Sequence, residues 1–474
     1  MSDAQSPLQS IFAKQQAAYL TDMNPSAEKR IERLDRAAQL VFENQEALCQ
    51  ALSDDYNGRH QYLTKMSEVM MSLNHIQDAK KRLRSWMNAE KRKVPFPMGL
   101  FGAKAHLHYQ PKGVVGIMSP WNFPIGMVFN PLATALAAGN RVIIKPSEFN
   151  PKTAELMGEL FKKYFPEDEV AMVTGGPEVG AEFSTIPFDH ILFTGATSIG
   201  RMVMQAAAKN LTPVTLELGG KSPVIISDNY DVKLAAEKIM AGKAMNSGQV
   251  CVSPDYIFVP EDKVQDFIEA AKATFQASFP DSSNNQDYTA VINSRHHDRI
   301  NGMITDAKEN GVDIFPLDDS QTSDEGNLRI PIHFAMNPTD DRKLMQEEIF
   351  GPIGIIKPYK DMDACITEIN KRERPLALYF FSNSKTEHQH VLNNTISGGV
   401  TLNNVTMHVA CQDLPFGGVG HSGIGNYHGH EGFKTFSHAR SVYTDGWLDL
   451  AKVAGIAPPY TEKTGKALDS QIKL

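Results

Sequence analysis

The chain has 474 residues, of which 42% are hydrophobic and 22% are charged, and its formal net charge is −8. A chain of this length exceeds one ordinary hydrophobic core, so we expect two or three domains. The acidic balance argues against nucleic acid as a partner, because phosphate binding needs clustered positive charge.

No segment reaches the roughly 18 uninterrupted apolar residues that a membrane span needs, so we expect no membrane partner. The first residues lack the apolar core of a signal peptide. The four cysteines, at positions 49, 251, 365 and 411, form no CxxC pair and no metal-type spacing. Scattered cysteines are typical of a reducing compartment, so we expect a cytoplasmic protein without disulfides or a bound metal.

The first hundred residues are predicted to be helical. Apolar residues fall on one helical face between Ile31 and Leu52, with charged residues between them. The segment from Val94 to Pro111 changes character, because its prolines and glycines are followed by the alternating run AKAHLHYQ. That alternation predicts an extended segment or a hairpin.

From residue 113 to residue 218, short runs of β-forming residues alternate with runs of helix-forming composition. This pattern indicates βαβ units and a parallel sheet. The five predicted strands are GVVGIM (113–118), RVIIK (141–145), VAMVTG (170–175), HILFTG (190–195) and PVTLEL (213–218).

A second α/β region follows from Pro223 to about residue 410. Its strands include DYIFVP (255–260), GPIGIIKPY (351–359) and LALYFF (376–381), with helical stretches between them. The tail after Gly446 is mixed in composition and contains two adjacent prolines. We expect this tail to be extended or partly disordered.

Glycine, proline or polar residues follow each of the five strands of the first region. In open α/β sheets, ligands bind at the carboxyl ends of the strands, so the coincidence predicts one binding crevice. The segments concerned are 119–124, 145–148, 175–176, 194–198 and 217–221.

Three further patterns have ordinary explanations. Gly418–Gly423 matches GxGxxG but does not directly follow a strand, so we interpret it as a flexible loop. Gly195–Gly200 has the spacing of a phosphate loop but lacks its lysine, so it predicts only a helix N-terminus near Ser198 that faces a pyrophosphate. The run HGHE (428–431) is not a known zinc motif, so we expect no metal there.

Cys251 ends the run NSGQVC (246–251), between a predicted helix and a predicted strand. A free cysteine is most often a small buried thiol, and taken alone Cys251 fits that interpretation. Its combination with the runs ELGG (217–220) and PWNFP (120–124) favours a catalytic thiol instead.

The chain contains, in this order, the motifs PWNFP (120–124), KPSE (145–148), FTGATSIG (193–200), LELGGKSP (216–223), GQVC (248–251), EEIFGP (347–352) and LPFGGVGHSG (414–423). In their order and spacing these motifs resemble those of the aldehyde dehydrogenase superfamily, and the resemblance extends from about residue 30 to about residue 445. Further runs, such as RPLALYFFS and YHGHEGFKTFSH, resemble the class 3 branch and especially its bacterial coniferyl-aldehyde dehydrogenase group.

This resemblance implies an α/β fold with a Rossmann-type parallel-sheet cofactor domain, an α/β catalytic domain and a small β oligomerisation arm. The cofactor domain would use residues 1–93 and 112–222, and the catalytic domain residues 223–410. The arm would use residues 94–111 and 438–445. The resemblance also implies that the protein forms a homodimer, or a homotetramer of paired dimers.

The resemblance further implies the roles of three catalytic residues. Cys251 would be the nucleophile, Glu217 the general base and Asn122 a donor to the oxyanion. The reaction would oxidise an aldehyde to the carboxylic acid through a thiohemiacetal and a thioester. Branches that transfer the acyl group to coenzyme A generally lack the glutamate, so Glu217 favours hydrolysis to the free acid.

For the cofactor, the resemblance implies NAD, with NADP left open. Glu148 would accept the adenosine ribose hydroxyls and repel a 2′-phosphate, whereas Lys145 can still pair with such a phosphate. Ala196 and Ser198 depart from the commonest family pattern, which leaves some pyrophosphate and ribose contacts open. The cofactor-binding residues would be Trp121, Lys145, Glu148, Gly195, Ser198, Gly200, Glu348 and Phe350.

Two other functions stay open at this point. Cys251 alone would also serve an esterase or thioesterase, and the same fold would also serve a non-catalytic binding or structural protein. The substrate is expected to be a small aldehyde, either aromatic, such as coniferyl aldehyde, or medium-chain aliphatic.

Overall fold

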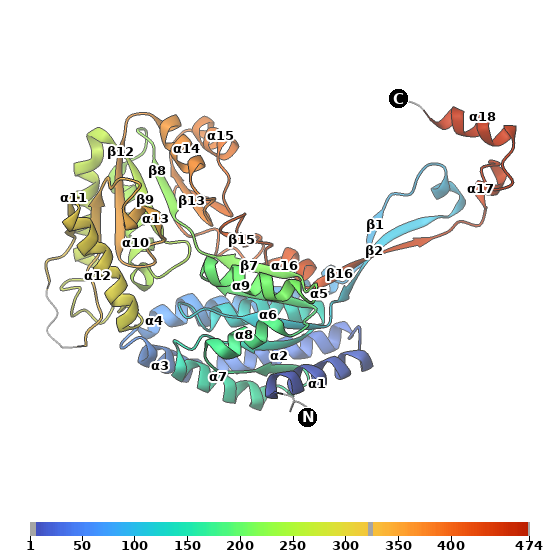
Figure 1. Ribbon diagram of the computed structural model, residues 1–474, viewed down its shortest axis with the longest axis horizontal. Coiled ribbons are helices and arrows are strands. Elements are labelled where there is room, and N and C mark those ends of the chain that lie inside the picture. The colour runs from blue at the N-terminus through green and yellow to red at the C-terminus, as the bar shows by residue number, and fades with distance from the viewer. Residues whose placement is uncertain (1–5, 321–325, 473–474) are drawn as a thin grey trace.

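The computed structural model describes residues 6–320 and 326–472, and its strands form three sheets (Figure 1). One sheet has six strands, one has seven, and a three-stranded ribbon extends away from both of them. The expected α/β fold, with a Rossmann-type parallel sheet, a second α/β region and a small β arm, is therefore confirmed.

The six-stranded sheet has the order β15-β7-β6-β3-β4-β5. All of its strands except β15 run parallel, so their carboxyl ends share one edge, as the sequence predicts. The two-residue strand β15 pairs antiparallel with β7. The bounds are β3 (Val114–Met118), β4 (Arg141–Lys145), β5 (Val170–Met172), β6 (His190–Gly195), β7 (Val214–Leu218) and β15 (Gly423–Ile424).

Helices cover both faces of this sheet, and the side chains of β4 show why. Val142 and Ile144 belong to the large core beneath α6, whereas Ile143 joins a separate core with Leu8 and Phe12 of α1. Successive strand residues point to opposite faces, so a sheet covered on both sides needs continuous apolar strands. The helices around this sheet are α1 (Pro7–Thr21), α2 (Ala27–Glu43), α3 (Gln45–Asp55), α4 (Gln61–Thr64), α5 (Met71–Trp86), α6 (Gly126–Ala138), α7 (Pro151–Tyr164), α8 (Pro177–Thr185) and α9 (Thr197–Ala208).

The seven-stranded sheet has the order β10-β11-β12-β9-β8-β13-β14 and is parallel except for β10. Its strands are β8 (Ser222–Ile226), β9 (Pro254–Pro260), β10 (Ile314–Pro316), β11 (His333–Met336), β12 (Ile353–Tyr359), β13 (Ala377–Phe381) and β14 (Gly399–Leu402). Its helices are α10 (Val232–Ala244), α11 (Val264–Ser278), α12 (Ser294–Glu309), α13 (Lys343–Gln346), α14 (Met362–Lys371) and α15 (Lys385–Asn394).

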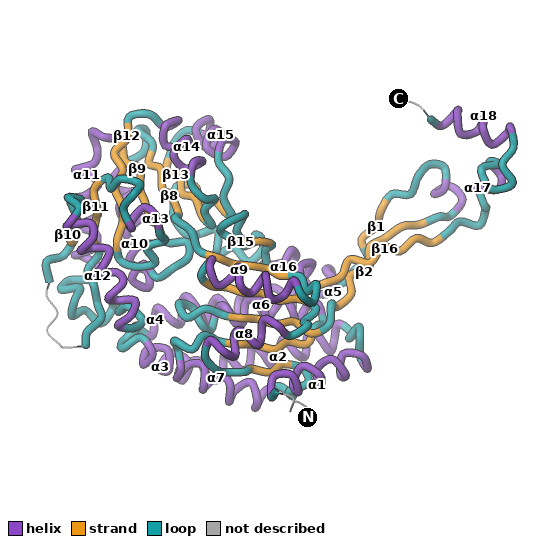
Figure 2. Tube along the Cα trace, viewed as in Figure 1, coloured by secondary structure: helices purple, strands orange, loops and turns teal. Residues whose placement is uncertain are grey.

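The three-stranded ribbon consists of β1 (Glu90–Arg92), β2 (Lys104–Pro111) and β16 (Ser437–Thr444), and it projects from the body (Figures 1 and 2). It begins before the predicted residue 94, because the charged run at 90–92 pairs with β2. The tail differs from the sequence prediction, since it forms α17 (Leu450–Val453) and α18 (Glu462–Gln471) at the far end of the ribbon. Helix α16 (Gly429–Thr435) precedes β16.

Across residues 6–320 and 326–472, no helix combines the length and the apolar character that a bilayer crossing requires.

Candidate active site

The three predicted catalytic residues come from three different segments. Glu217 lies in β7, where it pairs with Gly423 of β15. Asn122 follows β3 at the carboxyl edge of the same sheet. Cys251 lies in the turn that leads into β9 of the other sheet. The site therefore lies where the two sheets meet.

The turn before Cys251 has an unusual backbone. Asn246 and Ser247 have φ of +48° and +56°, in the left-handed region that side chains with a Cβ seldom adopt. Gly248 follows with φ of +71°, and a Cβ there would overlap the carbonyl oxygen of Gly351. Strained backbone of this kind persists only where its surroundings hold it, and it gathers at functional sites.

Asn122 is fixed beside this turn. Its side-chain amide donates to the carbonyl of Gln249, at 3.0 Å, and Asn122 is only 4% exposed. An amide nitrogen carries two N–H groups, so one is left to stabilise a negative oxygen near Cys251. Gln249 is held in turn, because its amide donates to the carbonyls of Asn246 and Ala290.

The Cys251 thiol is partly buried and lies near two carboxylates. Burial raises the pKa of Cys251 to about 12, and the charges of Glu348 and Glu217 add to the effect. A thiol in this state is protonated at neutral pH, whereas the thiolate is the nucleophilic form. A positive charge bound nearby, or neutralisation of the carboxylates, is needed to activate it.

Glu217 is almost completely buried, at 2% exposure. Neither of its carboxyl oxygens has a hydrogen-bond partner among the described residues. Burial raises the pKa of this carboxyl well above its ordinary value. A buried acid without a structural partner is costly, and such groups are typical of acid–base sites.

The Glu348 carboxyl contacts the residues that directly follow β7, the strand that carries Glu217. A Cβ on Gly219 would overlap the Glu348 carboxyl, and the N–H of Gly220 donates to it. Lys221 holds the backbone next to Glu348, since its Nζ donates a hydrogen bond to the carbonyl of Glu347 at 3.0 Å. The residue types at 219–221 therefore place the Glu348 carboxyl near Cys251.

An aromatic wall lines the same region. Trp121 lies against His296 of α12 and against Phe350, with ring centroids 4.9 and 5.2 Å apart. Phe350 has φ of +44°, so the loop after α13 bends sharply to present its ring. Flat rings in this arrangement suit a planar ligand that stacks or meets them edge-on.

The remaining predicted cofactor residues lie along the carboxyl edge of the six-stranded sheet. Lys145, at the end of β4, forms a 3.1 Å ion pair with Glu148. Helix α9 begins at Thr197 and receives no side-chain cap, so the N–H groups of Thr197 and Ser198 are left for an anion. A Cβ on Gly195 would press on the Phe193 ring, and one on Gly200 would press on Leu218.

Sequence reasoning missed Tyr427. Its hydroxyl donates to the Met127 sulfur at 3.5 Å, and burial, then the charges of Glu217 and Cys251, raise its pKa. Tyr427 therefore lies next to Glu217 and Cys251, two of the predicted catalytic residues. It follows the loop 418–423, in which Gly418 lies so close to Ser422 that a Cβ there would overlap the Ser422 carbonyl.

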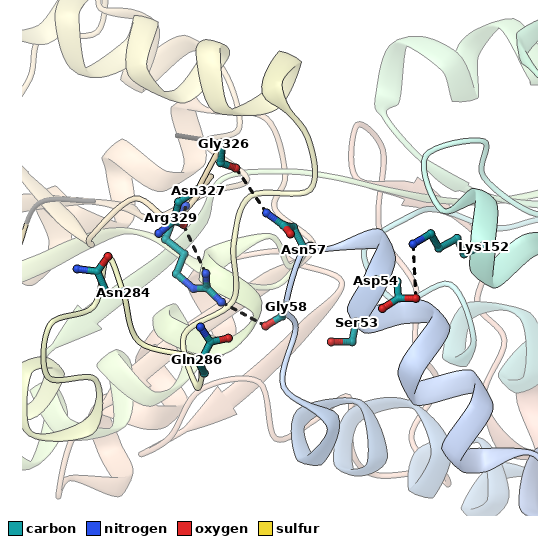
Figure 3. Close-up of a pocket in the computed structure, with 10 residues that line it drawn as sticks. All are labelled: Ser53, Asp54, Asn57, Gly58, Lys152, Asn284, Gln286, Gly326, Asn327 and Arg329. Atoms are coloured by element: carbon teal, nitrogen blue, oxygen red, sulfur yellow. Dashed lines mark hydrogen bonds and ion pairs between the residues drawn. The ribbon is translucent and has the colours of Figure 1, made fainter. Parts of the chain in front are cut away.

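A separate polar pocket of about 710 Å³ lies between the end of α3, the start of α7 and two loops of the second α/β region (Figure 3). In it, Arg329 donates to the carbonyl of Gly58 at 3.4 Å, and Lys152 pairs with Asp54 at 3.5 Å. None of the predicted site residues lines this pocket, so it is distinct from the Cys251 site.

Within the part of the chain that the structure describes, no group of three or more His, Cys, Asp or Glu side chains could hold a metal ion. The four cysteines are free. The rings of His75 and His428 are tilted against each other with centroids 4.3 Å apart, but among the described residues no carboxylate or thiol joins them to complete a metal site.

Replacing Glu348 by glutamine is expected to stabilise the folded protein more strongly at alkaline pH than at acid pH. Burial raises the pKa of Glu348 from 4.5 to about 8. Between these values the unfolded chain ionises this carboxyl while the folded protein keeps it neutral, so wild-type stability falls as pH rises. The Tm difference between Glu348→Gln and wild type should therefore grow from pH 4.5 to pH 8 in thermal unfolding. A constant difference would show that the folded protein does not hold this carboxyl neutral.

The chain is similar to known proteins over nearly its whole length. The model of the aldehyde dehydrogenase family matches residues 4–442. The chain is 47% identical to a probable coniferyl aldehyde dehydrogenase of Caulobacter vibrioides, over 98% of this chain and 96% of that protein. It is 42% identical to a coniferyl aldehyde dehydrogenase of Pseudomonas sp. strain HR199, over 95% and 93% of the two chains.

Among solved structures, the substrate-bound state of AldH from Staphylococcus aureus superposes with a TM-score of 0.92. That protein is 34% identical, and the match covers 99% of this chain and all of the other. A family match over nearly the whole chain, supported by relatives of this identity, settles the family. The chain belongs to the aldehyde dehydrogenase family, and it is an NAD(P)-dependent oxidoreductase that converts aldehydes to acids.

Proposed function

We propose that Cys251, Glu217 and Asn122 carry out the oxidation, with an aromatic aldehyde as the preferred substrate and NAD as the preferred cofactor. The observation that carries the assignment is the meeting of three segments at one point. The Asn122 amide is bonded to the backbone two residues before Cys251, and the Glu217 charge acts on the Cys251 thiol.

In the first step, the Cys251 thiol releases its proton to solvent and the resulting thiolate attacks the carbonyl carbon, so the C=O double bond becomes a single bond to a negative oxygen. The free N–H of Asn122 stabilises this oxyanion, and one such donor lowers the activation free energy by about 3–4 kcal/mol. The tetrahedral carbon can then lose hydride, which a trigonal aldehyde carbon does not readily do. A bound nicotinamide supplies the hydride acceptor for this step.

Loss of hydride leaves a thioester on Cys251. Glu217 then takes a proton from a water molecule, whose oxygen attacks the thioester carbon. The C–S bond breaks, so the carboxylic acid leaves and the cysteine sulfur is free again. The unpartnered oxygens of Glu217 support this role, because a carboxylate engaged in a salt bridge would be a poor base.

The chain's own residues fit a dinucleotide. The uncapped start of α9 suits a pyrophosphate, the Trp121–Phe350 wall suits a nicotinamide ring, and the Glu348 carboxyl suits ribose hydroxyls. Because these residues suit a dinucleotide, an esterase that uses the same thiol without a cofactor would be a side activity and not the main function. A non-catalytic role is not supported, since it leaves the buried Glu217 carboxyl unexplained.

The preference for NAD rests on Glu148. A carboxylate at the end of β4 repels a 2′-phosphate, and it engages Lys145, which would otherwise attract that phosphate. Glu148→Gln is expected to raise kcat/KM for NADP about tenfold, with a smaller loss for NAD. Initial rates with each cofactor measure the ratio. An unchanged ratio would remove Glu148 from cofactor selection.

The substrate assignment rests on the two coniferyl aldehyde dehydrogenases to which this chain is similar. Purified protein should be assayed with a panel of aromatic and medium-chain aliphatic aldehydes, each with NAD and with NADP. Formation of the reduced cofactor and of the acid is the readout. Higher kcat/KM for hydroxylated cinnamaldehydes than for hexanal supports the proposal, and the reverse order contradicts it.

The projecting ribbon supports a homodimer, or a homotetramer of paired dimers. Large apolar side chains are exposed on and beyond it, including Phe96 at 86% and Trp447 at 77% exposure. Exposed apolar groups of this size mark surfaces that another chain covers. Light scattering on the full chain measures the assembly directly.

The free cysteines support a reducing, cytoplasmic location.

A further inference from the structure

A buried ion pair lies beneath the loop that carries Asn122. Arg59 follows α3, and Glu68 lies in the π-helical turn at residues 65–70. Their side chains are 0% exposed, and Nη2 of Arg59 is 3.0 Å from Oε1 of Glu68. Burial raises the pKa of Glu68, and Arg59 opposes that effect. Moving two charges out of water costs much of what their attraction returns, so stability alone is a weak reason for such a pair.

The pair forms hydrogen bonds to the loop of Asn122 at two points. Nη1 of Arg59 donates to the backbone carbonyl of Asn122 at 2.8 Å. The other oxygen of Glu68 accepts the N–H groups of Ile125 and Gly126, at 2.7 and 3.2 Å, where α6 begins. The charged groups therefore bond the backbone on both sides of the short turn between β3 and α6.

Further contacts converge on the same carbonyl. The Tyr56 hydroxyl donates to it at 3.3 Å, and the Asn246 amide donates to it at 3.2 Å. The Arg59 guanidinium also lies over the Phe123 ring, 4.9 Å from its centroid. The Asn122 side chain, by contrast, has a single hydrogen bond among the described residues, to the Gln249 carbonyl. The position of its second N–H thus depends on how its backbone is held.

We propose that Arg59 and Glu68 are positioning residues for the oxyanion donor, because their buried ion pair holds the Asn122 peptide in the orientation that aims its amide at the Cys251 site. This inference rests on the proposed role of Asn122. Neither residue touches the reacting atoms. Their effect should appear in the rate of steps that build an oxyanion and be absent from steps that do not.

Arg59→Lys tests the proposal, because lysine keeps the positive charge but cannot bond Asn122 and Glu68 with the same planar fork. A displacement of about 1 Å at a catalytic group costs about a hundredfold in rate. We expect kcat for aldehyde oxidation to fall between about tenfold and a hundredfold, with KM changed less than about threefold. Glu68→Gln keeps an oxygen for the two N–H groups and removes the charge, so a loss in the same direction is expected.

Alkylation of Cys251 by iodoacetamide separates positioning from general damage. That reaction displaces iodide at a saturated carbon and needs the thiolate but no oxyanion donor. Peptide mass spectrometry should therefore show wild-type alkylation rates at Cys251 in Arg59→Lys. A parallel loss of alkylation and oxidation would mean that the substitution disturbs the whole site, which overturns the proposal.

Arg30 offers a matched control at the other end of α6. It is 1% exposed, and it donates to the carbonyls of Pro25 and Ala137, each at 2.9 Å. Arg30→Lys should lower Tm by a similar amount to Arg59→Lys while leaving kcat within about twofold of wild type. If kcat falls equally in both variants, Arg59 acts only through stability and the inference is wrong.

A double-mutant cycle with Asn122→Ala completes the test. Once the amide is gone, Arg59→Lys should have no further effect on kcat, because nothing remains to be positioned. Independent, additive losses would overturn the positioning role and leave the role of Asn122 intact. Wild-type kcat in Asn122→Ala itself would instead contradict the proposed function on which the inference rests.

Discussion

Cys251→Ala is expected to abolish the aldehyde-dependent reduction of NAD(P), lowering kcat by on the order of 10⁴-fold or more. Without the sulfur, the carbonyl carbon is not converted to a tetrahedral centre, so hydride is not released. Steady-state assays of cofactor reduction measure this loss. Because Cys251 is partly exposed and its side chain is small, thermal unfolding should change by only a few degrees.

Cys411→Ala is the matched control, because this thiol is exposed and lies outside the site. Its rate and substrate dependence should equal those of wild type. Substantial turnover by the Cys251→Ala variant, with folding intact, would exclude the covalent mechanism. Loss of cofactor binding in that variant would make its inactivity uninformative, so NAD(P)H binding should be measured by fluorescence alongside it.

Glu217→Gln is expected to leave the rate of the first turnover unchanged and to slow the later turnovers. Attack by Cys251 and loss of hydride do not require the Glu217 carboxylate, so a burst of reduced cofactor should appear, close to one equivalent per site. Hydrolysis of the thioester then lacks its base, and the steady-state rate should fall by about 10²–10⁴-fold. Stopped-flow measurement of the burst and the slow phase separates the two steps.

The pH dependence of the slow step provides a second readout. Burial raises the pKa of Glu217, so its basic form is populated only above the ordinary range of a glutamate. Wild-type hydrolysis should therefore slow as pH falls through that raised pKa, whereas Glu217→Gln should lack this dependence. Wild-type steady-state turnover in the variant would assign the base to another group.

The parallel strands of the first region were predictable because their signals are local. Apolar β-forming runs such as RVIIK, each followed by proline or glycine, mark a buried strand and its end within a few residues. The direction of the five strands follows from the helices between them, and it places their carboxyl ends on one edge. The strand β15 could not be predicted, since two residues pair with β7 across some two hundred residues of chain.

The structure of the C-terminal tail, by contrast, was not predictable from local sequence signals. Its helix α17 is only four residues long, its helix α18 is rich in polar residues, and the two bury little, so composition alone indicated an extended or partly disordered segment. The first ribbon strand was missed for a related reason. Its residues, EKR, are charged and carry no β signal, and only the pairing of Glu90 with Leu107 makes them a strand.

By itself, the sequence identified Cys251, Glu217 and Asn122 as candidates, because each stands in a short run whose order and spacing resemble one family. Only the tertiary structure revealed Arg59, Glu68 and Tyr427. Arg59 and Glu68 look like ordinary surface charges of a helical segment when they are met in the sequence. Burial and bonds to Asn122 and Ile125, more than fifty residues away, are what distinguish them. Contacts between distant segments leave no periodic pattern, so only the folded chain shows which side chains they hold in place.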